Sequence, residues 1–324
     1  MEIQSKAFLS EFKFLGVIGE GSFGRVYLVQ NKANLNLYAL KTIKKLENPT
    51  QHQVNLIAVE RDILMRNENP FITKLYAFFQ SKNYVYFLLE HCSHENLSHL
   101  ILREKKLSEA TAKFYAGCLV LGIEYLHSKG IIYRDLKPEN VLIDKRGYAK
   151  ITDFGLSEKG FSLDTKSFKF CGTINYMPPE MVAGIGHGLT ADWWSLGVVI
   201  YEMLVGVPPF IRQRKKRLFK AIIRRPARLP DESTVELIDL LDKLLRKNPK
   251  NRIGCEYDSM KIKIHPWFRE IDWEKLQRSE LEPPIMPIPP EIIEEVTGLD
   301  EEFLNDEVYL GEDSYSSLTP YFIM

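Results

Sequence analysis

Residues 133–140 read Tyr-Arg-Asp-Leu-Lys-Pro-Glu-Asn, and this stretch decides how the rest of the chain is interpreted. Asp135 and Asn140 lie five positions apart on a segment that Pro138 keeps from forming a regular helix, so both side chains can face one site. Lys137 adds a cation between them. A carboxylate that accepts a hydroxyl proton, a lysine that neutralises a moving phosphoryl group and an amide that binds a hard cation together suit phosphoryl transfer.

A second carboxylate follows at a short distance along the chain. Asp153-Phe154-Gly155 begins thirteen residues after Asn140, directly after the strand-like residues 149–151. Carboxylate and amide oxygens are preferred ligands of hard divalent cations. Asn140 and Asp153 are therefore predicted to bind two such ions.

A glycine-rich stretch near the N-terminus reads Gly-Glu-Gly-Ser-Phe-Gly over residues 19–24. Two folds use this spacing. A dinucleotide-binding unit needs a helix directly after the third glycine and an acid about twenty residues later. Residues 25–29 instead read as a strand, and Lys41 stands near the place of the acid. The pattern favours a hairpin whose backbone N–H groups approach the phosphates of a nucleotide.

Lys41 is the candidate phosphate-binding cation, on a strand predicted over residues 38–43. Glu60 lies on a helix predicted over residues 54–65, near the edge of its buried face. An ion pair between them would fix the lysine for the α- and β-phosphates.

The order of the predicted elements indicates an α+β fold with two lobes. Strands are predicted at residues 13–18, 25–29, 38–43, 72–79 and 85–89, and helices at 109–128, 192–205 and 233–245. A small β-rich lobe therefore precedes a larger helical lobe. From Glu282 the chain becomes Pro-rich and then acidic, which indicates an extended tail.

Composition excludes several classes of protein. The 43 basic and 43 acidic residues cancel, which gives no bulk electrostatic case for binding nucleic acid or an anionic membrane. The longest uncharged apolar-rich stretch, Trp193 to Tyr201, is far shorter than the ~20 residues that span a bilayer. Four scattered cysteines without a C-x-x-C pair fit reduced thiols. We expect a cytoplasmic location, with the nucleus as a second compartment.

With these motifs the chain resembles a eukaryotic protein kinase over residues 12–268. The matching features are the glycine-rich loop, Lys41, Glu60, residues 133–140, Asp153-Phe154-Gly155, Pro178-Pro179-Glu180, Asp192-Trp193-Trp194 and Arg252. Tyr133, the run 170–173 and the Pro-rich tail resemble the AGC group, which includes protein kinase A and Akt. Residues 192–204, 215–217 and 271–274 resemble the ribosomal S-six kinases. The resemblance implies an N-lobe over 12–90, a C-lobe over 91–268 and a C-terminal tail over 269–324.

The resemblance implies a role for each matching residue, with ATP and Mg²⁺ as cofactors. Asp135 would be the catalytic base, Lys137 would contact the γ-phosphate, and Thr173 would complete the catalytic group. Nucleotide-binding residues would be Ile18, Gly19, Glu20, Gly21, Ser22, Phe23, Gly24, Arg25, Val26, Ala39, Lys41, Glu60, Glu90 and Cys92, with Leu89 as gatekeeper. Asn140 and Asp153 would hold Mg²⁺.

The resemblance also implies how a protein substrate is recognised. Glu95, Glu139 and Glu202 would pair with arginines before the phosphoacceptor, and Phe170, Ile174 and Met177 would line an apolar site for the residue after it. We therefore expect Ser/Thr substrates with Arg at minus three, often with a further Arg at minus two or minus five. The basic run 212–217 is interpreted as a solvated helix face, with a docking patch as the alternative.

The activation segment, residues 153–180, departs from the family pattern. Lys169 stands where the family has a phosphorylated threonine, and Glu158 stands where it has a phosphate-binding base. The two changes are complementary, so Lys169, Glu158 and Arg134 are predicted to form an ion-pair cluster that replaces the phosphate. Thr165 and Ser167 remain alternative phosphorylation sites.

The tail departs from the pattern too. Residues 299–303 stand where the family covers the adenine, and residues 309–315, including Ser314, are an imperfect version of its hydrophobic motif. The resemblance allows an upstream kinase that acts on this tail.

We expect an active monomeric Ser/Thr kinase. Two rivals are weighed against it: a pseudokinase scaffold, although no residue required for catalysis is missing, and a small-molecule kinase, which the long segment 153–180 disfavours.

Overall fold

The computed structural model describes residues 9–21, 24–93, 95–228, 233–255, 259–287 and 309–310. The chain divides into two compact units. The first contains residues 1–68, 73–94 and 288–324, and the second contains residues 69–72 and 95–287. A β-rich unit and a helical unit confirm the predicted fold class.

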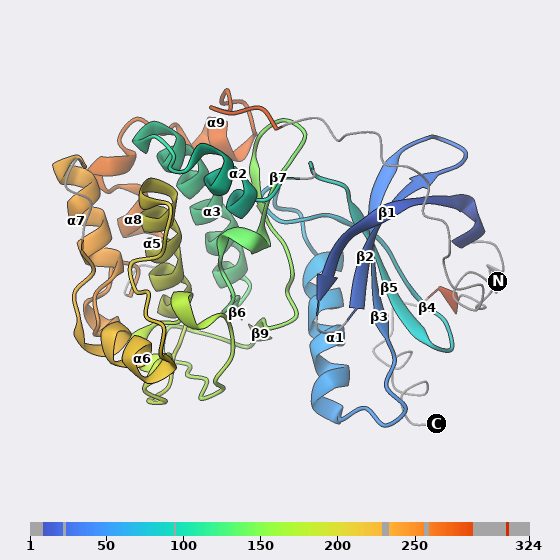
Figure 1. Cartoon of the computed structure of the whole chain (residues 1–324), viewed down its shortest axis with the longest axis horizontal. Coiled ribbons are helices and arrows are strands. Elements are labelled where there is room, and N and C mark those ends of the chain that lie inside the picture. The colour runs from blue at the N-terminus through green and yellow to red at the C-terminus, as the bar shows by residue number, and fades with distance from the viewer. Residues whose placement is uncertain are drawn as a thin grey trace. The chain divides into compact units, whose positions relative to one another are not determined.

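The first unit is built on an antiparallel sheet (Figure 1). Its strands are β1 (Phe12–Gly21), β2 (Gly24–Asn31), β3 (Leu37–Lys44), β4 (Leu75–Gln80), β5 (Tyr84–Glu90) and β10 (Tyr309–Leu310), in the order β1-β2-β3-β5-β4-β10. A short 3₁₀ turn, η1 (Leu9–Glu11), precedes β1. The strand predicted over 72–79 begins only at Leu75, because Phe71 and Ile72 pair with Ile151 of the second unit's β8.

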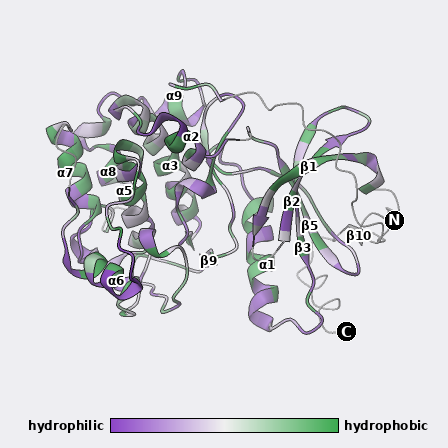
Figure 2. Ribbon diagram, viewed as in Figure 1, coloured by the Kyte–Doolittle hydropathy of each residue, from purple (hydrophilic) through white to green (hydrophobic). Residues whose placement is uncertain are grey.

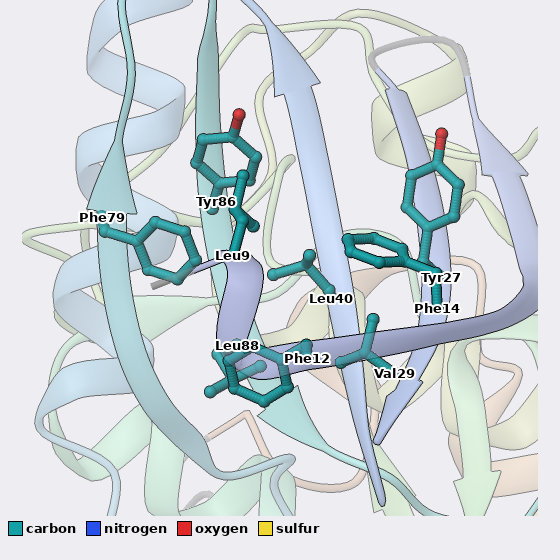
Figure 3. Close-up of a cluster of buried hydrophobic side chains, with 9 residues drawn as sticks. All are labelled: Leu9, Phe12, Phe14, Tyr27, Val29, Leu40, Phe79, Tyr86 and Leu88. Carbon is teal, nitrogen blue, oxygen red and sulfur yellow. The ribbon is translucent and has the colours of Figure 1, made fainter. Parts of the chain in front are cut away.

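The register of the sheet separates its two faces. Leu40 pairs with Tyr27 on one side and Leu88 on the other, so these three side chains share a face. They belong to a buried cluster that also contains Leu9, Phe12, Phe14, Val29, Phe79 and Tyr86 (Figure 3). Lys41 is the next residue along β3, so it points to the opposite face.

Among the described residues of the first unit, the α-helix is α1 (Gln51–Met65). Its predicted start at Val54 is three residues late. Thr50 and Gln53 form a capping box, in which the Thr50 side chain accepts from the Gln53 backbone N–H and Gln53 accepts from the Thr50 N–H. This cap begins the helix one turn earlier than the apolar pattern indicates.

The second unit is mainly helical (Figure 1). Its helices are α2 (Leu97–Glu104), α3 (Glu109–Ser128), α4 (Pro179–Val182), α5 (Thr190–Val205), α6 (Lys215–Arg224), α7 (Val235–Leu244), α8 (Met260–Lys263) and α9 (Trp273–Gln277). Two short antiparallel pairs join β6 (Ile131–Ile132) to β9 (Glu158–Lys159) and β7 (Val141–Ile143) to β8 (Ala149–Ile151). Single 3₁₀ turns lie at η2 (Pro138–Asn140), η3 (Ile174–Tyr176), η4 (Pro249–Asn251) and η5 (Pro266–Phe268).

The helix predictions for this unit are confirmed with small shifts at the ends. Ser108 caps α3 by accepting from the Thr111 N–H at 3.1 Å, as its position before the apolar stripe indicates. Helix α7 begins after Thr234 because the Thr234 hydroxyl supplies its cap. The basic run 212–217 is only half helical, since α6 begins at Lys215. In the described ranges, no helix combines the length and apolar character needed to span a membrane.

Candidate active site

In the first unit, one face of the sheet carries the predicted nucleotide-binding side chains. Val26 pairs with Lys41, and Ala39 lies two residues before it on β3, so all three share the face opposite the buried cluster. Lys41 Nζ lies 2.7 Å from Glu60 Oε1 on α1. The lysine side chain is 18% exposed and the glutamate 4%. The predicted ion pair is therefore present and presents a fixed, partly buried cation.

The glycine-rich hairpin joins β1 to β2. Gly24 is required by packing, because a Cβ at this position would lie 1.7 Å from the backbone oxygen of Thr42 on β3. Across the same hairpin Arg25 Nε lies 3.0 Å from Glu20 Oε1, with both side chains exposed. Ile18 and Gly19 precede this pair on β1, and Gly21 ends the strand. Ser22 and Phe23 lie outside the described residues.

The predicted adenine-binding segment follows β5. Leu89 is buried and pairs with Ala39 across the sheet. Glu90, at the end of β5, forms two hydrogen bonds with the backbone of Lys74. Its Oε1 accepts from the Lys74 N–H at 2.7 Å and its own N–H donates to the Lys74 carbonyl at 2.9 Å. Cys92 is buried two residues further on. This geometry fixes the path of the backbone.

In the second unit, a buried carboxylate shapes the loop that carries Asp135. Asp192, in the first turn of α5, is fully buried and accepts from the backbone N–H groups of Tyr133 and Arg134 at 2.9 and 2.8 Å. His127 contacts the same carboxylate at 2.9 Å. Arg134 consequently adopts φ +72°, a left-handed conformation that few non-glycine residues adopt.

The structure brings the predicted catalytic residues together around Asp135. Lys137 Nζ donates to Asp135 Oδ2 at 2.7 Å and to the Thr173 hydroxyl at 3.0 Å. Thr173 donates to Asp135 Oδ1 from both its N–H and its hydroxyl, each at 3.0 Å. Asn140 Nδ2 donates to Asp135 Oδ2 at 3.0 Å. The Asp135 carboxylate is held in one orientation by three residues.

Gly172 permits this close approach of the activation segment. Its φ is +94°, and a Cβ there would lie 2.5 Å from the backbone oxygen of Arg134. Both the backbone angle and the space exclude a larger residue. Glycine at position 172 therefore allows Thr173 to come within hydrogen-bonding distance of Asp135.

Asn140 and Asp153 are the candidate cation ligands. The Asn140 amide donates through Nδ2, so its carbonyl oxygen faces away from Asp135 and suits a hard cation. Asp153 has φ +58° and follows Thr152, whose N–H donates to the Asn140 carbonyl at 3.0 Å. No group of three or more His, Cys, Asp or Glu side chains in the described ranges forms a metal cage. The donor set fits Mg²⁺, which completes its shell with phosphate oxygens and water.

The predicted cluster in the activation segment is also present. Glu158 Oε1 lies 3.0 Å from Lys169 Nζ, and its Oε2 lies 2.5 Å from Arg134 NH1. The Ser167 hydroxyl donates to the same oxygen at 3.0 Å. Burial alone would raise the pKa of Glu158, but the Lys169 hydrogen bond and the Arg134 charge hold this pKa below its usual value. Glu158 is therefore an anion between two cations.

The two alternative phosphorylation sites differ in environment. Ser167 is buried, and it exchanges backbone hydrogen bonds with His187 at 2.8 and 2.9 Å. A phosphate on its hydroxyl would meet the Glu158 carboxylate. Thr165 is half-buried and its hydroxyl accepts from the Ser162 N–H. Of the two, Thr165 is the more accessible.

The predicted substrate carboxylates fall into two groups. Glu202 accepts from the Tyr176 hydroxyl at 2.7 Å. Burial raises the pKa of Glu202 to about 7, with a further increase from the charge of Glu139 and a partial decrease from Tyr176. Glu139 is exposed on η2. A cation between these two carboxylates would lower the pKa of Glu202 and gain two acceptors.

Glu95 is engaged within the chain. It is buried, and its Oε1 forms an ion pair with Arg103 NH1 in the last turn of α2. The same arginine contacts Glu104 at 2.9 Å through Nε. Arg103 carries no sequence signal as the partner of Glu95, because the pair depends on how the chain turns into α2 at the Asn96 cap. Tyr176, the hydrogen-bond donor to Glu202, was not predicted either.

The three predicted apolar substrate residues differ in exposure. Phe170 is 53% exposed, Ile174 is half-buried, and Met177 is buried. Phe168 in the same segment is 71% exposed. Two aromatic side chains of this segment, Phe168 and Phe170, are therefore exposed to solvent.

Glu180 and Arg252, two of the residues that carry the resemblance, form an ion pair. Arg252 donates to both Glu180 oxygens, at 2.7 and 2.9 Å, with both side chains buried. The predictions for residues 299–303 and Ser314 concern residues outside the described ranges. Of residues 309–315, Tyr309 and Leu310 are described, and they pair with Gln80 and Phe79 of β4.

Comparison with known proteins agrees with this geometry. A family model described as "Protein kinase domain" matches residues 12–268. The chain is 41% identical over 290 residues to "Ribosomal protein S6 kinase 2 alpha" of Gallus gallus, an alignment that covers 88% of this chain and 38% of the relative. The human "Ribosomal protein S6 kinase alpha-3" is 41% identical over 290 residues, covering 88% of this chain and 39% of the relative.

A nematode relative covers a larger share of its own length. "Serine/threonine-protein kinase sgk-1" of Caenorhabditis elegans is 39% identical over 279 residues, covering 86% of this chain and 60% of the relative. The chain therefore spans less than two thirds of the length of each of these curated relatives, from 38% to 60%.

Proposed function

The chain belongs to the protein kinase domain family, and from this premise we propose that it is an ATP- and Mg²⁺-dependent serine/threonine protein kinase. The observation that carries the proposal is the orientation of Asp135. Its carboxylate accepts hydrogen bonds from Lys137, Asn140 and Thr173, so its position is fixed before a substrate arrives. A preorganised base of this kind needs no rearrangement at the moment of reaction.

The proposed reaction assigns a step to each of these groups. The acceptor hydroxyl donates its proton to Asp135 as its oxygen bonds to the γ-phosphorus of ATP, and the bond to the β-phosphate oxygen breaks to release ADP. Lys137 neutralises the charge on the transferring group. Asn140 and Asp153 would hold Mg²⁺, which would supply further charge neutralisation at the phosphates. In the first unit, Lys41 binds the α- and β-phosphates while Glu60 fixes its position.

We propose basic protein substrates for this kinase. Glu139 and Glu202 would receive arginines before the acceptor, and Glu95 would receive the arginine at minus three. Support comes from the raised pKa of Glu202, which signals a carboxylate that lacks a cation and gains by binding one. Phe170 and Ile174, both partly exposed, would contact the residue after the acceptor.

The cellular setting is also a proposal. We propose a monomer in a reducing compartment, the cytoplasm and also the nucleus. None of the four cysteines, all of which lie in the described ranges, forms a disulfide, which supports such a compartment. An upstream kinase acting on the tail belongs to the same proposal.

The test is phosphoryl transfer by purified protein. The chain is incubated with γ-labelled ATP, Mg²⁺ and three peptides that share an Arg-rich core and differ only in a Ser, Thr or Tyr acceptor. Transfer to Ser and Thr but not Tyr is the expected result. ATP binding without transfer to any acceptor would favour the pseudokinase scaffold and overturn the proposal.

A further inference from the structure

A strongly basic surface surrounds helix α6. We define the α6 basic patch by its eight cations between residues 212 and 225: Arg212, Arg214, Lys215, Lys216, Arg217, Lys220, Arg224 and Arg225. No Asp or Glu occurs between residues 203 and 230. Because the whole chain has no net charge, this concentration is a local feature and not a consequence of composition.

All eight cations of the patch are exposed. Helix α6 buries Leu218, Ala221 and Ile222 against the rest of the unit, which turns its charged positions outward. The ribbon of α6 in Figure 2 accordingly carries both hydrophobic and hydrophilic positions. None of the eight forms an ion pair with another described residue.

The placement of these charges is unfavourable for an isolated helix. Lys215, Lys216 and Arg217 occupy the first turn of α6, where the helix macrodipole favours anions. Lys216 and Lys220 are also four residues apart, so like charges face each other. A negatively charged partner would relieve both effects.

The patch is continuous with the surface predicted to hold the substrate. Phe219 of α6 lies with its ring centroid 6.1 Å from that of Phe170, the exposed aromatic next to Thr173. Lys215 Nζ lies 5.6 Å from the Phe219 centroid. Helix α6 also packs against α4, which follows the segment of Ile174.

We propose that the α6 basic patch binds an acidic stretch of the protein substrate on the C-terminal side of the phosphoacceptor. The inference rests on the proposed function, in which Phe170 contacts the residue after the acceptor. An extended chain advances roughly 3.3 Å per residue, so the 6.1 Å between the two rings corresponds to about two residues. Helix α6 is about 15 Å long, a length that about five further residues of an extended substrate would span. Acidic residues at about plus three to plus seven therefore reach the patch.

This partner fits the surface better than a membrane does. An amphipathic helix binds a bilayer by inserting its apolar face, and the apolar face of α6 is buried in the protein. Exposed charge pairs act mainly on the rate of encounter and are screened by salt. The acidic stretch should therefore lower KM more than it changes kcat.

The experiment uses the full chain and four synthetic peptides. All four share one Arg-rich core with a serine acceptor. One carries four glutamates at plus three to plus six, one carries four glutamines there, one carries the glutamates at an equal distance before the core, and one ends after the core. At low salt we expect kcat/KM to be about tenfold higher with downstream glutamates than with glutamines, and the advantage to vanish at about 0.5 M salt.

Matched charge reversals locate the effect. In the variant Lys216→Glu/Lys220→Glu, the ratio of kcat/KM for the downstream-glutamate peptide to kcat/KM for the glutamine peptide should fall to one or below. In Lys145→Glu/Lys250→Glu, which changes two exposed lysines of the same unit by the same charge, the ratio should stay near tenfold. A ratio near one in the unmodified chain, or an equal benefit from glutamates placed before the core, overturns the docking proposal while the proposed function stands.

A complete absence of transfer to all four peptides would instead count against the proposed function. Anionic vesicles or RNA provide the last comparison. If either binds through Lys216 and Lys220 while the peptide ratio is near one, the patch serves that partner and the substrate proposal is wrong.

Discussion

Reversing charges in the Glu158–Lys169–Arg134 cluster should change activity in a direction that depends on the background. These ion pairs connect the activation segment to residues 133–140, with distances of 3.0 Å for Lys169–Glu158 and 2.5 Å for Arg134–Glu158. We expect Lys169→Glu to lower activity in the unmodified chain and to raise it when Glu158 has been changed to lysine.

The magnitudes follow from exposure. Lys169 is 51% exposed, so the gross attraction of about 1.4 kcal/mol at 3.0 Å in a water-like dielectric leaves only ~0–1 kcal/mol after entropy and salt. The Arg134 side chain is 2% exposed, so removing its acid leaves a buried cation and costs about 2–3 kcal/mol. Glu158→Lys should therefore reduce kcat/KM about 30- to 160-fold, and Lys169→Glu by no more than about fivefold.

The double variant restores one acid between two cations. Glu at position 169 would then pair with Arg134 and with Lys at position 158, as a phosphate would. Adding Lys169→Glu to Glu158→Lys should recover about tenfold in kcat/KM, which together with the cost of Lys169→Glu alone is a coupling of about 1.4–2.4 kcal/mol. The single variants and the double variant together measure this coupling.

The assay is peptide phosphorylation by protein made in bacteria, with intact mass used to confirm that no phosphate is attached. Lys166→Glu is the matched control, since Lys166 is exposed on the same segment and makes no ion pair with a described residue. Equal losses from Lys169→Glu in both backgrounds would refute the electrostatic coupling. Unmodified protein that stays inactive until Thr165 is phosphorylated would refute the substitution of the phosphate altogether.

Three further outcomes follow from the site. The pKa of Glu202 is about 7 and arginine binds its ionised form, so kcat/KM for a peptide with Arg at minus two should rise severalfold from pH 6 to 8, relative to a peptide without this arginine. Glu202→Gln should flatten that part of the pH profile. Arg103→Leu removes the ion pair between Arg103 and Glu95, so the preference for Arg over Ala at minus three should increase several-fold in a peptide competition. An unchanged preference would contradict the competition between Arg103 and the substrate arginine for Glu95. Gly172→Ala places a Cβ 2.5 Å from the Arg134 backbone oxygen at φ +94°, which should destabilise the local conformation of the segment by about 1–3 kcal/mol. Most of the kinase activity should be lost while the melting temperature of the chain changes little.

The sequence allowed most of the fold and the charged contacts of the site to be predicted. Short, strongly marked motifs located Asp135, Lys41 and Glu60, because each residue type is dictated by one chemical task. The Glu158–Lys169 pair was also predictable, since two complementary departures from one pattern indicate a contact. Membership of the protein kinase family, recognised from these motifs, is confirmed by the match over residues 12–268.

Other contacts depend on geometry that no local pattern encodes. The Arg103–Glu95 pair joins residues on either side of a helix cap, so its existence follows from the turn at Asn96 and not from a spacing. The need for glycine at position 24 comes from the Thr42 oxygen on a neighbouring strand. The late start of β4 reflects a bridge from Ile72 to Ile151, far along the chain.

Single-turnover transfer by Asp135→Asn tests the central claim most directly. The variant keeps the shape of the side chain but removes the carboxylate that accepts from Lys137, Asn140 and Thr173. With γ-labelled ATP and an Arg-rich serine peptide, transfer should fall at least about a thousandfold, while ATP affinity measured on the same protein should change less than about threefold. A loss of less than tenfold in transfer, with ATP binding intact, would contradict the assignment of Asp135 as the base.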